Sequence, residues 1–485
     1  MLVFVRGLRL WRNKSNEARN QQFAIDFVAV MGLRIAMLTL SLLAWLSGWA
    51  AAQPVPPQSP APSTSVSPSV RFSQPTTATD LDTYIKNFDY AQLANAVDAM
   101  RPSLDRDYFA GVLANRAGHV DESIELLTKV LPQLESSEPD RAAVALHSLA
   151  DDYIKTYRYN DTIQAYEELL HKFASHMDKV ERQGADDDYH AVLLLKDMPT
   201  QTISFDGRID LPTHRNPVLD NIETNLTING VEQSWVLDTG ANFSTVSASF
   251  ASKLGVQLSR EVAQTRGITG AENKLHVALL PELKLGGATI RNVVLLVLDD
   301  NNLNVPMGKT MRYQINAVLG YPVLQALKRI TFTKDGHFLA GPDSPSWQDS
   351  ARLYMNELTP LLECQVENRK VLFSFDTGAN RSVLSDRYLR GFPDDFKGLK
   401  KKPYAMSGAG GLKKMTAYYL PNVQLGVGQA NPVLHKVPVV PVMGTDMDRL
   451  YGNLGRDLVD PYQSFTIDFE SMRFSMGDKL TSHPK

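Results

Sequence analysis

WVLDTGAN, at residues 235–242, recurs almost unchanged as FSFDTGAN at residues 373–380, 138 residues further along the chain. Each copy places an Asp-Thr-Gly turn directly after an apolar, strand-like run. A single Asp-Thr-Gly indicates no more than an ordinary turn, because aspartate and glycine are both common in turns. Two copies in one chain indicate an internal duplication in which each half contributes one acidic turn.

The agreement between the two halves extends on both sides of the turns. Residues 223–242 align without a gap with residues 361–380, and both segments read as a strand, a tight turn and a second strand. Downstream, each half has a glycine cluster and later an apolar segment that ends in glycine. The clusters are Gly267, Ile268, Thr269, Gly270 and Gly408, Ala409, Gly410, Gly411, and the later segments end at Gly320 and at Gly455.

These motifs resemble those of the aspartic proteases, above all the retropepsin-like lobe found in bacterial aspartyl proteases. The resemblance covers about residues 221–476, more than half of the chain. It implies an all-β fold of two lobes, residues 221–345 and residues 346–485, which together form one site. Asp238 and Asp376 are therefore the expected catalytic residues.

The resemblance also assigns supporting roles. Thr239 and Thr377 would bond across the interface of the lobes, and Gly240 and Gly378 would allow the tight turns. The two glycine clusters would be the tips of flaps that close over an extended peptide.

The resemblance further implies that the later glycine segments support the core of each lobe. In the second half Gly455 is followed by Arg456 and Asp457, the pattern of the family. In the first half Gly320 is followed by Tyr321 and Pro322, so this half lacks the Arg-Asp pair. The departure puts the geometry of the first lobe in doubt.

Two carboxyl groups suffice for peptide hydrolysis without a cofactor. One carboxylate takes a proton from water while a carboxylic acid polarises the scissile carbonyl, and two such groups about 3 Å apart cannot both ionise. The aspartic proteases are the standard example of such a pair. The sequence does not say which aspartate holds the proton. No metal or other cofactor is expected, since the ten histidines form no HExxH or HxxxH pair.

Residues 80–182 have the periodicity of helices. Residues 109–131 and 147–170 both place small and apolar residues at helical spacing, and they align with each other at an offset of 39. They resemble tetratricopeptide helix pairs, whose period is about 34 residues, and a plain helical bundle is the alternative. Repeats of that kind bind peptides on a concave surface, so we expect this domain to present substrates or to dock a protein partner.

The N-terminus predicts export. Residues 35–49 form an uncharged apolar run that follows Arg34 and precedes small residues, as in a secretory signal, so residues 1–52 are expected to be removed, with Met31 as the expected start. An uncleaved signal anchor in the inner membrane is the alternative. The Pro/Ser/Thr-rich residues 53–79 predict an extended linker. Cys364 is the single cysteine, which together with export favours the periplasm or cell envelope of a bacterium.

The formal net charge of −3, without any basic stripe interleaved with aromatic residues, argues against a nucleic-acid partner. The sequence thus predicts a multidomain chain: an all-α, tetratricopeptide-like domain, a linker at residues 183–220, and an all-β, two-lobed aspartic endopeptidase acting on peptides or proteins as a monomer. A protein that binds peptides or cell-wall fragments in the same cleft without cutting them is the rival hypothesis. A homodimer with sites between chains is disfavoured because one chain holds both halves.

Overall fold

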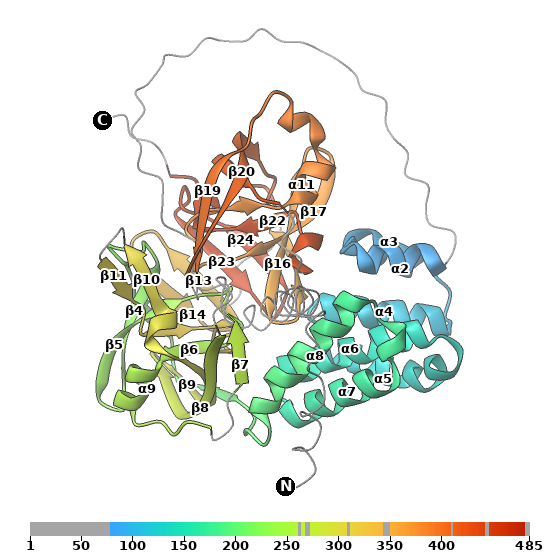
Figure 1. Cartoon of the computed structure of the whole chain (residues 1–485), viewed down its shortest axis with the longest axis horizontal. Coiled ribbons are helices and arrows are strands. Elements are labelled where there is room, and N and C mark those ends of the chain that lie inside the picture. Colours follow the sequence, from blue (N-terminus) through green and yellow to red (C-terminus); the bar gives the residue numbers. More distant parts are fainter. Residues whose placement is uncertain are drawn as a thin grey trace, which may run out of the picture.

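The structure is a computed structural model that describes residues 78–259, 263–266, 272–307, 311–342, 350–408, 411–441 and 446–480. The predicted signal region and most of the predicted linker lie outside these residues. Helices form the N-terminal part and strands dominate the rest (Figure 1). None of the helices in the described part of the chain has the length and apolarity needed to cross a membrane.

The N-terminal region is a succession of antiparallel helices. Side-chain caps fix where two of the helices begin: Ser103 accepts a hydrogen bond from the Arg106 N–H at the start of α4, and Asp178 forms a capping box with Glu181 at the start of α8. The turns that follow α4 and α6 each contain a residue in the left-handed region, Gly118 (φ 75°) and Tyr157 (φ 61°). The helices are α2 (Ala78–Lys86), α3 (Tyr90–Ala99), α4 (Leu104–Arg116), α5 (Val120–Ser137), α6 (Pro139–Lys155), α7 (Tyr159–Lys172) and α8 (Lys179–Val192), with short 3-10 turns η3 (Ala174–His176) and η4 (Leu193–Leu195).

The described residues after the helical region form two large sheets and one hairpin. The strands are β1 (Thr202–Phe205), β2 (Ile209–Pro212), β3 (His214–Arg215), β4 (Ile222–Ile228), β5 (Val231–Leu237), β6 (Ser244–Ser247), β7 (Ala263–Arg266), β8 (Glu272–Leu285), β9 (Ala288–Leu298), β10 (Asn304–Met307), β11 (Met311–Gln314), β12 (Ala317–Leu319), β13 (Arg329–Thr333), β14 (His337–Ala340), β15 (Ala351–Asn356), β16 (Thr359–Val366), β17 (Arg369–Phe375), β18 (Val383–Leu384), β19 (Lys402–Gly408), β20 (Gly411–Gln424), β21 (Val433–Val439), β22 (Gly452–Leu454), β23 (Ser464–Asp468) and β24 (Arg473–Met476). The short helices between them are α9 (Ala248–Leu254), α10 (Tyr321–Ala326), α11 (Asp386–Gly391), η5 (Asp300–Leu303), η6 (Pro393–Phe396), η7 (Asp446–Arg449) and η8 (Arg456–Leu458).

One order of strands occurs in both sheets. The first sheet contains β4-β5-β12-β6-β9-β8-β7, and the second contains β16-β17-β22-β18-β21-β20-β19. The strand directions match as well. The parallel pair β5 and β12 of the first sheet corresponds to the parallel pair β17 and β22 of the second. In the same way, the parallel pair β6 and β9 corresponds to the parallel pair β18 and β21. The repeat seen in the sequence is therefore a repeat of the strand arrangement.

The last strands of the first half join the sheet of the second half. β13 pairs antiparallel with β23, and their ends are tied by an ion pair of 2.8 Å between Arg329 and Asp468. Phe332 stacks on Phe465 with ring centroids 4.8 Å apart. This shared sheet, which also includes β14 and β2, connects the two halves through a common apolar layer.

Residues 183–220, expected to be a linker, are largely folded. Helix α8 continues to Val192, and strands β1, β2 and β3 pair with β9, β14 and β4. The apolar residues of this stretch explain the difference, since Leu194, Leu195 and Ile209 are buried in the core.

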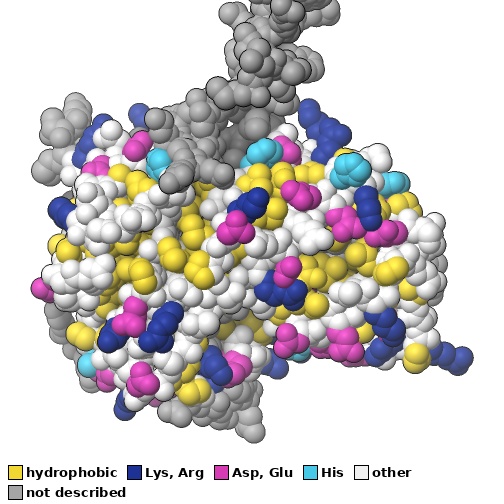
Figure 2. Space-filling view, turned by 90° about the horizontal axis from the view of Figure 1, so that it is seen from below, with side chains coloured by type: hydrophobic (Ala, Val, Ile, Leu, Met, Phe, Trp, Pro, Cys, Tyr) yellow, Lys and Arg dark blue, Asp and Glu magenta, His cyan; other side chains and the backbone are white. Residues whose placement is uncertain are grey.

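The helical region is packed against the strands. Phe88 and Tyr90 share an apolar cluster with Tyr354, whose ring centroid lies 5.2 Å from that of Tyr90. The Tyr157 hydroxyl donates a hydrogen bond of 2.9 Å to the carbonyl of Pro322 in the first half. On the face in Figure 2, Lys and Arg side chains are interspersed with Asp and Glu side chains and with hydrophobic ones.

Candidate active site

The two aspartates occupy equivalent strand ends. Asp238 follows β5 and Asp376 follows β17. The backbone N–H of each aspartate donates a 3.0 Å hydrogen bond to the neighbouring parallel strand, Asp238 to Leu319 of β12 and Asp376 to Leu454 of β22. Pairing with these short strands therefore fixes where each carboxyl group leaves the sheet.

Reciprocal hydrogen bonds join the two turns. The Thr377 hydroxyl accepts from the Thr239 N–H at 2.9 Å and donates to the Leu237 carbonyl at 2.8 Å. The Thr239 hydroxyl accepts from the Thr377 N–H at 3.1 Å and donates to the Phe375 carbonyl at 3.3 Å. Each hydroxyl thus uses its donor and its acceptor capacity on the opposite half, and the two turns face each other in one site.

The carboxyl groups lie close together in this site. Asp238 is 0% exposed and Asp376 is 4% exposed. The Oδ1 atom of Asp238 accepts from the Gly240 N–H at 2.9 Å, and that of Asp376 accepts from the Gly378 N–H at 2.8 Å and the Ala379 N–H at 3.1 Å. A Cβ atom added to Gly378 would lie 2.4 Å from Oδ2 of Asp238, so the glycine leaves the space that this carboxyl group fills.

The pKa values of both aspartates are raised. Burial raises the pKa of Asp238 well above its ordinary value, and the neighbouring Asp376 carboxylate raises it further. Burial also raises the pKa of Asp376, to about 6, against the opposing effect of hydrogen bonds from the Asp238 carboxyl group and the two N–H groups. Oδ2 of Asp238 accepts no hydrogen bond from any N–H or hydroxyl group in the described part of the chain. A proton on Asp238, donated to Asp376, satisfies both groups.

The two glycine segments cross the turns at close range. A Cβ atom on Gly320 would lie 2.4 Å from the carbonyl carbon of Phe243, and one on Gly455 would lie 2.7 Å from that of Arg381. The N–H groups of both glycines donate 3.1 Å hydrogen bonds to serine hydroxyls, Gly320 to Ser244 and Gly455 to Ser382. The sequence analysis missed these serines, although each stands six residues after its aspartate.

The expected Arg-Asp support differs between the halves. Asp457 accepts hydrogen bonds from the N–H and the hydroxyl of Ser382, at 2.9 and 2.6 Å, and the buried Arg456 reaches Asp220 at 3.3 Å. In the first half the carbonyl of Pro322 instead accepts hydrogen bonds from Tyr157 and, at 3.0 Å, from Gln201. In the first half, hydrogen bonds from the helical region and from the segment that follows it therefore take the place of the missing Arg-Asp pair.

Asn453 is a second residue that the sequence analysis missed. Its amide nitrogen lies 3.5 Å from Oδ2 of Asp376, and its amide oxygen accepts a 2.7 Å hydrogen bond from the Ser374 hydroxyl. Asn453 is the strand partner of Ser374, and in the first half the equivalent position is Val318, the strand partner of Val236. No signal in one sequence distinguishes this asparagine from an ordinary strand residue.

Hairpins stand where flaps were expected. The pairing of β7 with β8 ends at Arg266 and Glu272. The predicted tip, Gly267, Ile268, Thr269 and Gly270, lies outside the described residues. The pairing of β19 with β20 ends at Gly408 and Gly411. Ala409 and Gly410 of the second predicted tip also lie outside the described residues.

Residues 224–323 match the family model described as aspartyl protease. The match includes Asp238 and Gly320. It spans less than half of the chain, and no curated protein matches the chain.

Two solved structures show a distant likeness. The crystal structure of edgp is 10% identical, with 57% of this chain and 96% of that chain covered at a TM-score of 0.34. A retropepsin-like aspartic protease from Rickettsia conorii is 22% identical, with 30% of this chain and 96% of that chain covered at a TM-score of 0.21. Because both TM-scores are below 0.5, we draw no conclusion from either likeness.

Proposed function

We propose that this chain is an aspartic endopeptidase whose single site is formed between two tandem retropepsin-like lobes. The observation that carries the proposal is the reciprocal pairing of the two Asp-Thr-Gly turns, which brings Asp238 and Asp376 together in a buried pair. The aspartyl protease family model over residues 224–323 supports it independently.

The two carboxyl groups have different roles in this proposal. Asp376 receives N–H donors from Gly378 and Ala379, so its ionised form is the better stabilised and it acts as the base that takes a proton from water. Asp238, with its pKa raised well above the ordinary value, is the acid that polarises the scissile carbonyl. As the tetrahedral intermediate collapses, Asp376 gives the proton it took from water to the leaving amine, and a hydroxyl group of the intermediate returns a proton to Asp238, so the pair is restored without a metal or a covalent intermediate.

The hairpins β7–β8 and β19–β20 serve as flaps over an extended peptide in this scheme. The site is complete in one chain, so the active form is a monomer. A sedimentation experiment in which activity appears only in a dimer would contradict this.

The helical region has a supporting role. Helices α4–α5 and α6–α7 form two tetratricopeptide-like pairs, with left-handed residues Gly118 and Tyr157 at matching positions 39 residues apart. It docks a protein partner or substrate through surfaces not packed on the strands. Removal of residues 1–52 during export to a bacterial periplasm or envelope is part of the proposal, and a mature protein recovered with the apolar run at residues 35–49 intact would contradict cleavage.

The test is cleavage of a diverse peptide library by the purified chain between about pH 4 and 7.5. Asp238→Asn and Asp376→Asn are each expected to abolish cutting, a loss of at least about a thousandfold, because either substitution removes one half of the acid–base pair. Asp394→Asn, at a carboxylate whose side chain is 84% exposed, is the matched control and leaves the rate unchanged.

Cutting that persists in either site variant would overturn the proposal. Saturable peptide binding without any cutting by the unmodified chain would instead favour a binding protein on the same fold.

A further inference from the structure

Three side chains that can bind metal ions converge where the helices meet the strands. His147 lies on α6, Asp188 on α8, and Glu357 in the turn between β15 and β16. Each offers one ligand atom, and the three atoms lie within 4.8 Å of one another. All three residues are partly buried. The sequence analysis expected no metal site because it searched for closely spaced pairs, and these residues are far apart along the chain.

We propose that His147, Asp188 and Glu357 bind a divalent transition-metal ion, with zinc as the best match, and that this ion fastens the helical region to the strands. Zinc takes imidazole and carboxylate ligands at about 2.0–2.2 Å, and where the protein supplies three ligands, as in catalytic zinc sites, a water molecule takes the fourth position. Small rotations of three side chains already within 4.8 Å would bring them to such distances. Calcium and magnesium are less suited, because both favour sites made of oxygen atoms alone.

The charges around the cluster favour a cation. Asp188 and Glu357 bring two carboxylates together at an interface that excludes part of the solvent. Arg116 pairs with Asp151 at 3.1 Å and also lies close enough to Glu357 for their charges to attract. A divalent ion between Asp188 and Glu357 would relieve their mutual repulsion, which is stronger in a partly buried place than in water.

A buried ring closes one side of the cluster. Tyr166 is 3% exposed, and its ring centroid lies 5.8 Å from that of His147. The ring limits the rotamers of His147, which lowers the entropy cost of metal binding.

The location gives the ion a mechanical role. Figure 1 shows α4, α6 and α8 on the side of the helical region that is nearer to the strands, with α5 and α7 further away. The β15–β16 turn that carries Glu357 reaches this side, and Tyr354 of β15 already contacts Tyr90. Thr359, two residues after Glu357, lies 3.4 Å from Asn242 beside the first Asp-Thr-Gly turn. A metal at Glu357 would therefore hold a segment that continues to the proposed active site.

The experiment measures zinc binding directly. The full chain is stripped with EDTA, dialysed and titrated with zinc chloride by calorimetry, and its thermal unfolding is followed with and without zinc. We expect saturable binding of one zinc ion per chain and a higher unfolding temperature with zinc, because the ion binds the folded state. Glu357→Gln, a nearly isosteric change in a turn, is expected to weaken binding by more than about tenfold.

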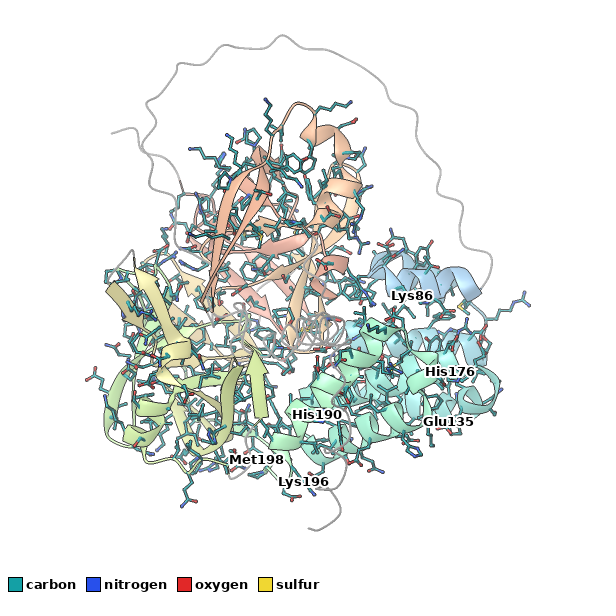
Figure 3. All side chains as sticks on the ribbon, viewed as in Figure 1. Lys86, Glu135, His176, His190, Lys196 and Met198 are labelled. Carbon is teal, nitrogen blue, oxygen red and sulfur yellow. The ribbon has the colours of Figure 1, made fainter. Side chains whose placement is uncertain are left out.

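His190→Gln is the matched control. His190 lies on the same α8 helix, where Figure 3 labels it, and stands 3.8 Å from Asp186 in an exposed pair. Zinc binding should be unchanged in this variant. Binding that is absent from the unmodified chain, that survives Glu357→Gln, or that is lost in His190→Gln would overturn the proposal. Circular dichroism of Glu357→Gln verifies that it is folded, and Asp188→Asn provides a second ligand variant. Neither outcome depends on peptidase activity.

Discussion

At the turn of Asp238 the neighbouring strand β12 supplies Val318, whereas at the turn of Asp376 strand β22 supplies Asn453. The backbones of the two turns are alike, down to the 3.0 Å hydrogen bonds that each aspartate N–H donates to the parallel strand. The side chains around them differ, since the Asn453 amide lies 3.5 Å from Asp376 where the first half has Val318. The comparison teaches that a duplicated backbone can place two identical carboxyl groups while different neighbours give them different acidities.

A second difference concerns what lies behind each turn. The second half is supported by its own Asp457 and Ser382, whereas the first half presents the Pro322 carbonyl to Tyr157 and Gln201. The first half thus depends on residues outside its lobe. This explains how it keeps the same strand pairing at Asp238 without the Arg-Asp pair.

Among changes that leave both aspartates in place, the largest effect is expected from closing the space between the turns. Gly378→Ala would place a Cβ atom 2.4 Å from Oδ2 of Asp238, so one carboxyl group must move away from the other. Peptidase activity should fall by at least about a hundredfold, because the acid–base pair needs sub-ångström placement.

The matched control is Gly207→Ala, whose added Cβ atom would meet nothing nearer than 3.8 Å. Initial rates on one peptide and circular dichroism of both variants check the prediction. A Gly378→Ala protein that keeps its fold and more than half of its activity would show that the two carboxyl groups do not act together.

Much of this arrangement could be predicted from the sequence, because the duplication places equivalent residues in equivalent strands. Ser244 and Ser382 could have been included by extending the alignment, since they keep the same offset as the aspartates. The helical nature of the N-terminal region followed from its periodicity.

Other features depend on contacts between distant segments and are invisible to local patterns. Strands β1–β3 in the stretch expected as a linker are short, and their partners β9, β14 and β4 are known only once the sheets are assembled. The same holds for the contact of Asn453 with Asp376 and for the cluster of His147, Asp188 and Glu357, because each brings together residues that are far apart along the chain.

A smaller effect, on the free energy of unfolding, is expected from replacing Ser382 or Ser244 by alanine, and the size of the effect should differ between the two. Ser382→Ala removes a donor to the partly buried Asp457 carboxylate and the acceptor of the Gly455 N–H, so it should lower the free energy of unfolding by about 2–3 kcal/mol. Ser244→Ala removes the acceptor of the Gly320 N–H and should cost about 1 kcal/mol. Urea unfolding of both variants measures the difference. Equal losses would mean that Asp457 adds nothing to the support of the second half.

The smallest effect is expected from making the second turn resemble the first. The Asn453 amide lowers the pKa of Asp376, opposing the rise to about 6 that burial causes. Asn453→Val removes this donor, so the pKa of Asp376 should rise. If Asp376 must be ionised to activate water, the fraction of active enzyme at a given acidic pH falls, and the acid limb of the pH–rate profile moves to higher pH by less than about one unit.

Ser374→Ala provides the internal check on this last prediction. The Ser374 hydroxyl donates to the Asn453 amide oxygen at 2.7 Å and so orients the amide nitrogen toward Asp376. Loss of that orientation should move the acid limb in the same direction as Asn453→Val but less far, with the alkaline limb unchanged in both variants. If the acid limb stays in place in Asn453→Val, the unequal acidities of the two aspartates come from the backbone donors and burial, and the difference between Val318 and Asn453 has no part in assigning the acid and the base.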